Sequence, residues 1–144
     1  MRVADRFRVA FARSRLSGIT LARQFMIRPK LRHLHSPDFD APRLPPDPTN
    51  CIVLIQAIVG PDGGPGEESF DFCVVTPSYL QAQHGPRWGR GLLIVESFDW
   101  AVVRRVVEER LASVAHNTWE QVGHELNKEL LWEFDNYRDV PGTP

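Results

Sequence analysis

The alternation of apolar and polar residues predicts two long neighbouring strands in the middle of the chain. Residues 51–59, CIVLIQAIV, are apolar at almost every position, which is typical of a central strand buried on both faces. Residues 67–75, EESFDFCVV, instead place phenylalanines on one face and polar side chains on the other. The segment between them, GPDGGPG, contains four glycines, which supply positive φ wherever a turn needs it. The pattern therefore predicts an antiparallel hairpin.

A turn centred near Gly63 also predicts the register of this hairpin, with facing residue numbers that sum to about 127. In this register Gln56 faces Asp71 on one side of the sheet. These two polar residues have apolar neighbours, so they are either hydrogen-bonded to each other or available to a partner. The other side is the predicted core face, which carries Phe70, Phe72, Val74, Val53, Ile55 and Ala57.

Two further strands and a short helix complete the predicted sheet region. Residues 27–35 have thinly spaced apolar positions, which predicts an edge strand, and residues 91–98 predict a last, strong strand. Thr76 followed by Pro77 is typical of a helix N-cap and first helical residue, so residues 76–83 predict a short helix.

The C-terminal part of the chain shows helical periodicity. Asp99 is the expected N-cap of a helix that runs to about Val114, and Thr118 begins a Thr-x-x-Gln capping box. The buried stripe of the second helix is predicted to contain Trp119, Val122, Leu126 and Leu130. The fold class is therefore α+β: a mostly antiparallel sheet of about four strands, packed against two C-terminal helices, with one short helix after the third strand.

The charge distribution divides the chain into two parts. Residues 1–25 carry six Arg against one Asp, a net charge of +5, while residues 26–144 carry 11 basic against 17 acidic residues, a net charge of −6. We expect a single domain over residues 26–140 and a basic N-terminal arm over residues 1–25 that is disordered or outside the functional unit. The arm could otherwise bind nucleic acid or act as a targeting segment.

Candidate catalytic and metal-binding residues do not assemble into a known pattern. His33 and His35 share a strand face but lack a third ligand of comparable placement. Cys51 and Cys73 lie in apolar strand sequence, as buried thiols do. The sequence thus predicts no catalytic, cofactor-binding or metal site, and no run of about 20 apolar residues predicts a membrane span.

Four blocks of the sequence resemble the immunity protein 8 family of bacterial polymorphic-toxin systems. They are LHSPD at 34–38, EESFDFCVVTPSYL at 67–80, GRGLLIVESFDW at 89–100, and the pair WEQV at 119–122 and WEFDNY at 132–137. Together they span about residues 28–138. The resemblance implies a cytoplasmic, non-catalytic α+β protein that binds and neutralises a cognate toxin.

If the partner is a toxin, acidic and aromatic side chains are the expected contact residues. Acidic residues complement a basic surface, such as that of a nuclease, and Trp is frequent among interface anchors. The candidate partner-binding residues are Gln56, Glu67, Glu68, Asp71, Trp88 and Glu96. No membrane or nucleic-acid partner is expected for the domain, and the alternative function is a protein-interaction or regulatory domain unrelated to toxins.

Overall fold

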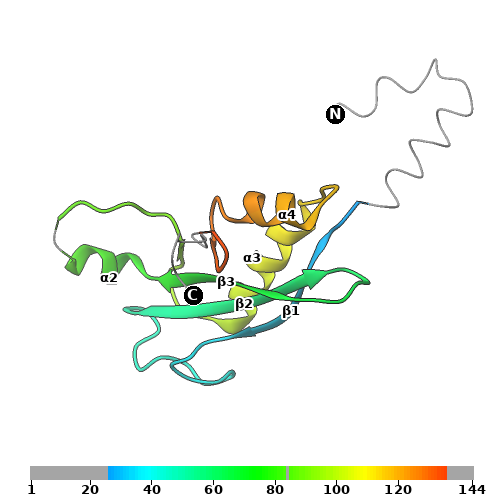
Figure 1. The fold of residues 1–144 in the computed structure, drawn as a ribbon. Coiled ribbons are helices and arrows are strands. Elements are labelled where there is room, and N and C mark those ends of the chain that lie inside the picture. Colours follow the sequence, from blue (N-terminus) through cyan, green and yellow to red (C-terminus); the bar gives the residue numbers. More distant parts are fainter. Residues whose placement is uncertain (1–25, 84, 136–144) are drawn as a thin grey trace, which may run out of the picture.

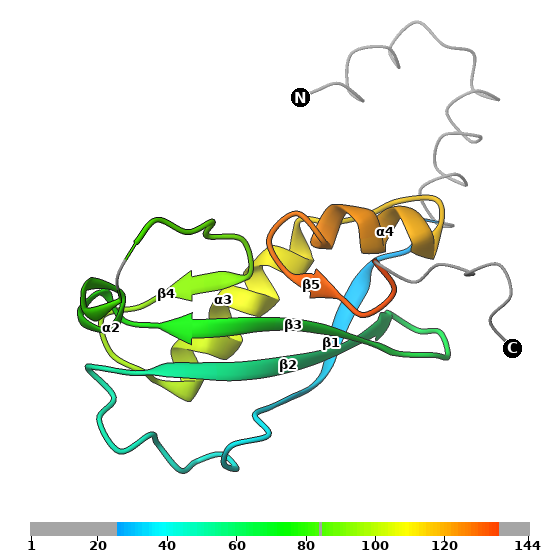
Figure 2. The same cartoon turned by 60° about the vertical axis from the view of Figure 1, so that its left-hand side comes forward.

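The chain has an α+β fold in which helices cover one face of a single sheet. The computed structural model describes residues 26–83 and 85–135. The sheet has five strands, in the order β1-β2-β3-β4, with β5 also paired to β3. In both views of the ribbon, α3 lies behind the strands and the near face carries no helix (Figures 1 and 2). The elements are β1 (Pro29–His35), β2 (Ile52–Pro61), β3 (Glu68–Val75), α2 (Pro77–Ala82), β4 (Leu92–Ile94), α3 (Trp100–Ala112), α4 (Trp119–Leu126) and β5 (Leu131–Trp132).

The central hairpin has the predicted register. Strands β2 and β3 pair antiparallel from Ile52↔Val75 to Val59↔Glu68, so every facing pair sums to 127, and Gln56 lies opposite Asp71. Phe72 is 2% exposed, and the predicted core face is buried throughout. The turn and the alternation of β3 determine this register, because a slip of one residue would expose the phenylalanines.

Strand β1 is an edge strand, as predicted, although it starts at Pro29 rather than Ile27. Ile27 instead forms an isolated bridge with His116, through N···O distances of 2.7 and 3.1 Å. The register between β1 and β2 shifts at Arg32, whose Nη2 donates to the carbonyl oxygens of Pro61 and Gly64 at 2.6 and 2.7 Å. The bulge thereby directs this guanidinium to the turn end of the sheet.

The predicted strand over residues 91–98 is wrong in its length. Strand β4 spans only Leu92–Ile94, and it pairs with β3 in parallel. The reason is the connection: α2 and the following loop form a crossover, and a crossover returns the chain parallel to the strand that it left. Thr76 precedes α2 as predicted, but its side chain does not cap the helix. Its Oγ1 accepts a hydrogen bond from Cys51 N at 3.0 Å and so joins β3 to the start of β2.

The two C-terminal helices start at the predicted caps. Asp99 accepts from Ala101 N at the start of α3, and Thr118 and Gln121 form the capping box of α4. Helix α4 ends at Leu126, however, so the prediction that Leu130 belongs to it is wrong. Leu130 is buried, but it lies in the turn that leads to β5.

Strand β5 was not predicted, and it joins the C-terminal block to the sheet edge beside β4 (Figure 2). The Asn127 side chain accepts from Trp132 N at 3.0 Å, and Glu133 N donates to Ser69 O at 3.1 Å. The Trp132 ring stacks on Phe70 with a centroid distance of 6.1 Å. A Cβ at Gly123 would lie 2.6 to 2.7 Å from this indole, so α4 requires glycine there.

Candidate partner-binding face

The face of the sheet opposite α3 is the candidate site, and we call it the helix-free face. Its side chains form cross-strand rows, because residues paired across a sheet point to the same side. A polar row joins His35, Gln56 and Asp71 and ends at Leu131. The row on its turn side contains His33, Ile58 and Ser69. Two rows follow on its other side: first Leu54, Cys73 and Leu92, and then Ile52, Val75 and Ile94.

This face is more apolar than a solvated sheet face usually is. Antiparallel sheets with one open face normally alternate apolar residues inward and polar residues outward. Here Ile52 is 38% exposed, Ile94 59% and Leu131 42%, and Leu54 and Ile58 are half-buried. Exposed aliphatic side chains gathered on one open sheet face are typical of an interaction site.

Two aspartates, Asp71 and Asp38, contribute negative charge to the helix-free face near Cys73. Asp71 accepts a hydrogen bond from Ser69 Oγ at 2.6 Å, and Asp38 N donates to Ser36 Oγ at 3.1 Å in the turn that follows β1. Burial raises the pKa of the Cys73 thiol, and the charges of Asp38 and Asp71 raise it further. Asp71 lies two residues from Cys73 on the same face of β3, so its negative charge is close to this thiol.

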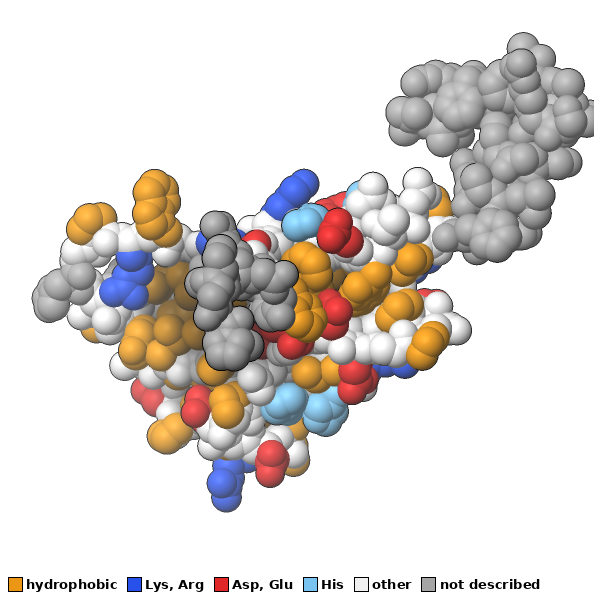
Figure 3. Space-filling model, in the orientation of Figure 1, with side chains coloured by type: hydrophobic (Ala, Val, Ile, Leu, Met, Phe, Trp, Pro, Cys, Tyr) orange, Lys and Arg blue, Asp and Glu red, His pale blue; other side chains and the backbone are white. Residues whose placement is uncertain are grey.

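The histidines at the β1 end of this face are packed against each other. The rings of His33 and His35 are 5.0 Å apart between centroids. His35 Nδ1 is buried and has no hydrogen-bond partner among the residues that the structure describes. Within the same described residues, no group of three or more side chains could hold a metal ion. In the view of Figure 3, histidine, acidic and hydrophobic side chains are interspersed below the centre, and Lys and Arg lie towards the margins.

The structure does not bring the six predicted site residues together. Gln56 and Asp71 are opposite each other on the helix-free face, but Asp71 accepts from Ser69. Trp88 is 96% exposed in the loop before β4, and Glu96 is exposed after that strand.

The two glutamates of the hairpin differ from each other. Glu67 is exposed, whereas Glu68 lies on the helix side of β3, where its Oε1 accepts hydrogen bonds from the indoles of Trp119 and Trp132, each at 2.8 Å. This carboxylate therefore joins three parts of the chain that are far apart in sequence. Sequence reasoning missed Asp38 and the outward aliphatic residues, although the register already placed Leu54 and Ile58 beside Gln56.

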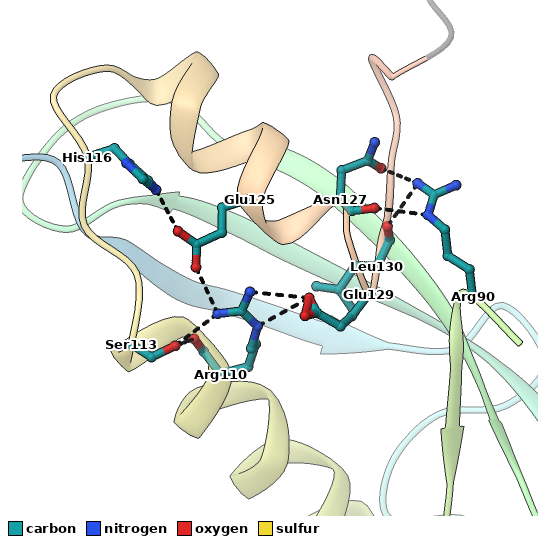
Figure 4. Close-up of polar contacts among 8 residues, drawn as sticks. All are labelled: Arg90, Arg110, Ser113, His116, Glu125, Asn127, Glu129 and Leu130. Atoms are coloured by element: carbon teal, nitrogen blue, oxygen red, sulfur yellow. Dashed lines mark hydrogen bonds and ion pairs between the residues drawn. The ribbon is translucent and has the colours of Figure 1, made fainter.

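On the helix side of the molecule, several charged residues pair with one another (Figure 4). Arg110 donates to Glu125 at 3.1 Å and to Glu129 at 3.2 Å, and His116 Nε2 is 2.6 Å from Glu125. Burial opposes the charge of Arg110, but these carboxylates raise its pKa overall. The hydrogen bond with His116 lowers the pKa of Glu125, and Arg110 lowers it further against the effect of burial. This network holds α3, α4 and the segment between them in place.

A second set of hydrogen bonds holds the turn after α4. Arg90 donates from Nε to the Asn127 carbonyl at 2.9 Å and from Nη2 to the Asn127 side chain at 2.6 Å (Figure 4). Beside it, a cavity of about 190 Å³ opens between β4, α3 and this turn. Apolar side chains line it, and the paired Arg110 and Glu129 lie among its lining residues.

Comparison with protein families decides the relationship of this chain to known proteins. The model of the family described as immunity protein 8 matches residues 29–137. The chain belongs to the immunity protein 8 family. The match covers all the described strands and helices of this family member, so the earlier resemblance is confirmed. No curated protein and no solved structure matches the chain.

The blocks that carry the family resemblance meet in space. LHSPD supplies His35 on the edge strand β1 and Asp38 just after that strand, and EESFDF supplies Asp71 on the central strand β3. GRGLLIVESF supplies Leu92 and Ile94 beyond β3.

No helix of the described residues is long and apolar enough to cross a membrane.

Proposed function

We propose that this chain is an immunity protein that binds a cognate toxin and neutralises it by occlusion, in the bacterial cytoplasm and without catalysis. The observation that carries the proposal is the family match, which extends over residues 29–137 and therefore over the whole described fold. The open apolar face supports it, because a protein that acts by binding needs a surface that a partner can desolvate.

Occlusion sets a requirement on affinity. A toxin made in the same cell must be silenced at low concentration, which needs a nanomolar complex or tighter, about −12 kcal/mol or better. Steric blocking then suffices, and the protein needs no nucleophile or general base.

The acidic balance of residues 26–144 favours a basic toxin, such as a nuclease. These residues carry a net charge of −6, and Glu67, Glu96 and Asp71 are part of it. Opposite charges accelerate the encounter of two proteins, and dissolved salt screens this attraction. The rate of association should therefore fall as the ionic strength rises.

The test is a stopped-flow measurement with the purified toxin domain encoded beside the gene of this chain. The association rate constant should fall about tenfold or more between low and physiological salt. Glu67→Lys should slow association, whereas Lys128→Glu, an exposed control of opposite sign, should not. Equal rates at all salt concentrations would refute the electrostatic part, and the absence of any complex would refute the function.

A further inference from the structure

We infer that the helix-free face is the docking surface, and that it takes a toxin surface on which a Lys or Arg side chain is surrounded by apolar residues. This inference rests on the proposed function and names the surface and the partner chemistry that the function leaves open. It is supported in three ways. Asp38 and Asp71 lack ion-pair partners among the described residues, aliphatic side chains lie on both sides of the polar row, and a second copy of the chain would bring the same negative charge.

The two acids of the helix-free face have no ion-pair partner among the described residues, unlike four of the glutamates on the helix side. On the helix side, Glu108, Glu109, Glu125 and Glu129 each form an ion pair with an arginine. On the helix-free face, neither Asp38 nor Asp71 forms an ion pair within the part of the chain that the structure describes. The guanidinium of Arg32, the arginine of β1, is bound to the carbonyl oxygens of Pro61 and Gly64 at the turn end. The middle of the face thus has negative charge that a cation of a partner can complement.

Aliphatic side chains lie on both sides of the polar row, so they would surround a cation bound there. Ile58 lies on one side of the polar row, and Leu54, Leu92, Ile52 and Ile94 lie on the other. An ion pair gains strength when apolar side chains exclude water from it, and such surrounded contacts carry most of the energy in many interfaces. A lone basic side chain would leave these aliphatic residues exposed, so the partner surface must be apolar around its cation.

A second copy of this chain does not fit the same face. A symmetric dimer with its twofold axis at the middle of this face would bring Asp38 and Asp71 of both copies together, and like charges at a buried interface repel each other. The occupant must therefore carry the opposite charge, which within the proposed function is the toxin.

The first experiment measures the affinity of face variants and matched controls for the same purified toxin domain. Asp71→Arg and Ile94→Asp should each weaken binding about 30-fold or more, as loss of an interface hot spot does. The controls are Glu109→Arg on α3 and Leu44→Asp in the loop after β1, where Leu44 is 49% exposed; both should bind within about threefold of the wild type. Melting temperatures identify a variant that fails to fold, and Ile94, which is 59% exposed, provides the variant least sensitive to this problem.

The outcomes separate this inference from the proposed function. If the wild type does not bind the toxin, the function itself is wrong. If the wild type binds and the face variants bind equally well, only the docking surface is wrong.

The second experiment uses Cys73 as a reporter at the centre of the face. Its alkylation by N-ethylmaleimide, followed by mass spectrometry at this residue, should slow about tenfold or more when the toxin is bound, because the interface excludes the reagent. An unchanged rate would overturn the inference. So would a rate that rises on dilution of the free protein, or on removal of residues 1–25, because the face would then be covered by a second copy or by the basic arm.

Discussion

At the scale of single residues, Glu68 shows how a family-like motif can serve the fold rather than the partner. One carboxylate oxygen accepts hydrogen bonds from Trp119 and Trp132. These tryptophans lie 51 and 64 residues further along the chain, and their rings contact Phe70. The sequence placed Glu68 among candidate partner-binding acids because its indole partners become neighbours only in the folded chain.

Replacing Glu68 with alanine should therefore lower stability. The variant would leave two partly buried indole N–H donors without an acceptor, which costs about 1 to 3 kcal/mol of the free energy of unfolding. Glu67→Ala is the matched control, because Glu67 is exposed, and its effect should stay within about 0.5 kcal/mol. Urea unfolding followed by tryptophan fluorescence measures both. Equal stability of the two variants would contradict the structural role of Glu68.

At the scale of elements, the packing of α3 against α4 depends on ionised side chains. Glu125 lies between His116 and Arg110, and these partners lower its pKa in the folded protein. A lowered pKa means that the folded state binds this proton less readily than the unfolded state. The stabilisation is therefore complete above the ordinary glutamate pKa of about 4.3 and is lost as the pH falls through the folded value.

The expected consequence is a pH-dependent effect of Glu125→Gln. At pH 7 the variant should be less stable than the wild type, because glutamine cannot pair with the charged Arg110. Below about pH 4 the difference should shrink, since the wild-type carboxyl is then losing its charge as well. Denaturant unfolding at a series of pH values measures this difference. A constant difference from pH 7 to pH 3 would show that the charge of Glu125 does not matter.

The elements also show which parts of the fold the sequence could predict. The hairpin register and the caps of α3 and α4 depend on neighbouring residues, so the alternation of residues 67–75, Asp99 and Thr118 were sufficient to predict them. Strands β4 and β5 are three and two residues long, and each is defined by its pairing with β3, which lies further back in the sequence. The local pattern indicated a strand at β4 but not its short length, and it contained no signal for the two-residue β5.

The candidate site was predictable to a similar degree. Gln56 and Asp71 were correctly placed opposite each other, because the register alone decides their pairing. Asp38 was not recognised, because its approach to Cys73 depends on the path of the chain after β1. The partner-binding role of the six candidate residues therefore stays a prediction, and variants of the helix-free face test it.

At the scale of the whole molecule, the basic arm over residues 1–25 lies outside the described residues. We propose that the functional unit begins at Met26, because the family match begins at residue 29 and Ile27 bridges to His116. A chain of residues 26–144 should keep the melting temperature of the full chain within about 2 °C and should protect cells equally well against the toxin. Removal of residues 1–28 is the informative comparison, because it deletes the Ile27 bridge and should lower stability. Unfolding, or lost protection, of the 26–144 chain would show that the arm is integral.

Titration of toxin activity against increasing amounts of this chain tests the central claim most directly. Occlusion predicts that the residual activity falls linearly to zero at one equivalent, that the fall does not depend on incubation time, and that denaturation of the complex releases intact toxin. Loss of toxin activity at a small fraction of one equivalent, growing with time, would show that the chain destroys the toxin catalytically and would contradict this account.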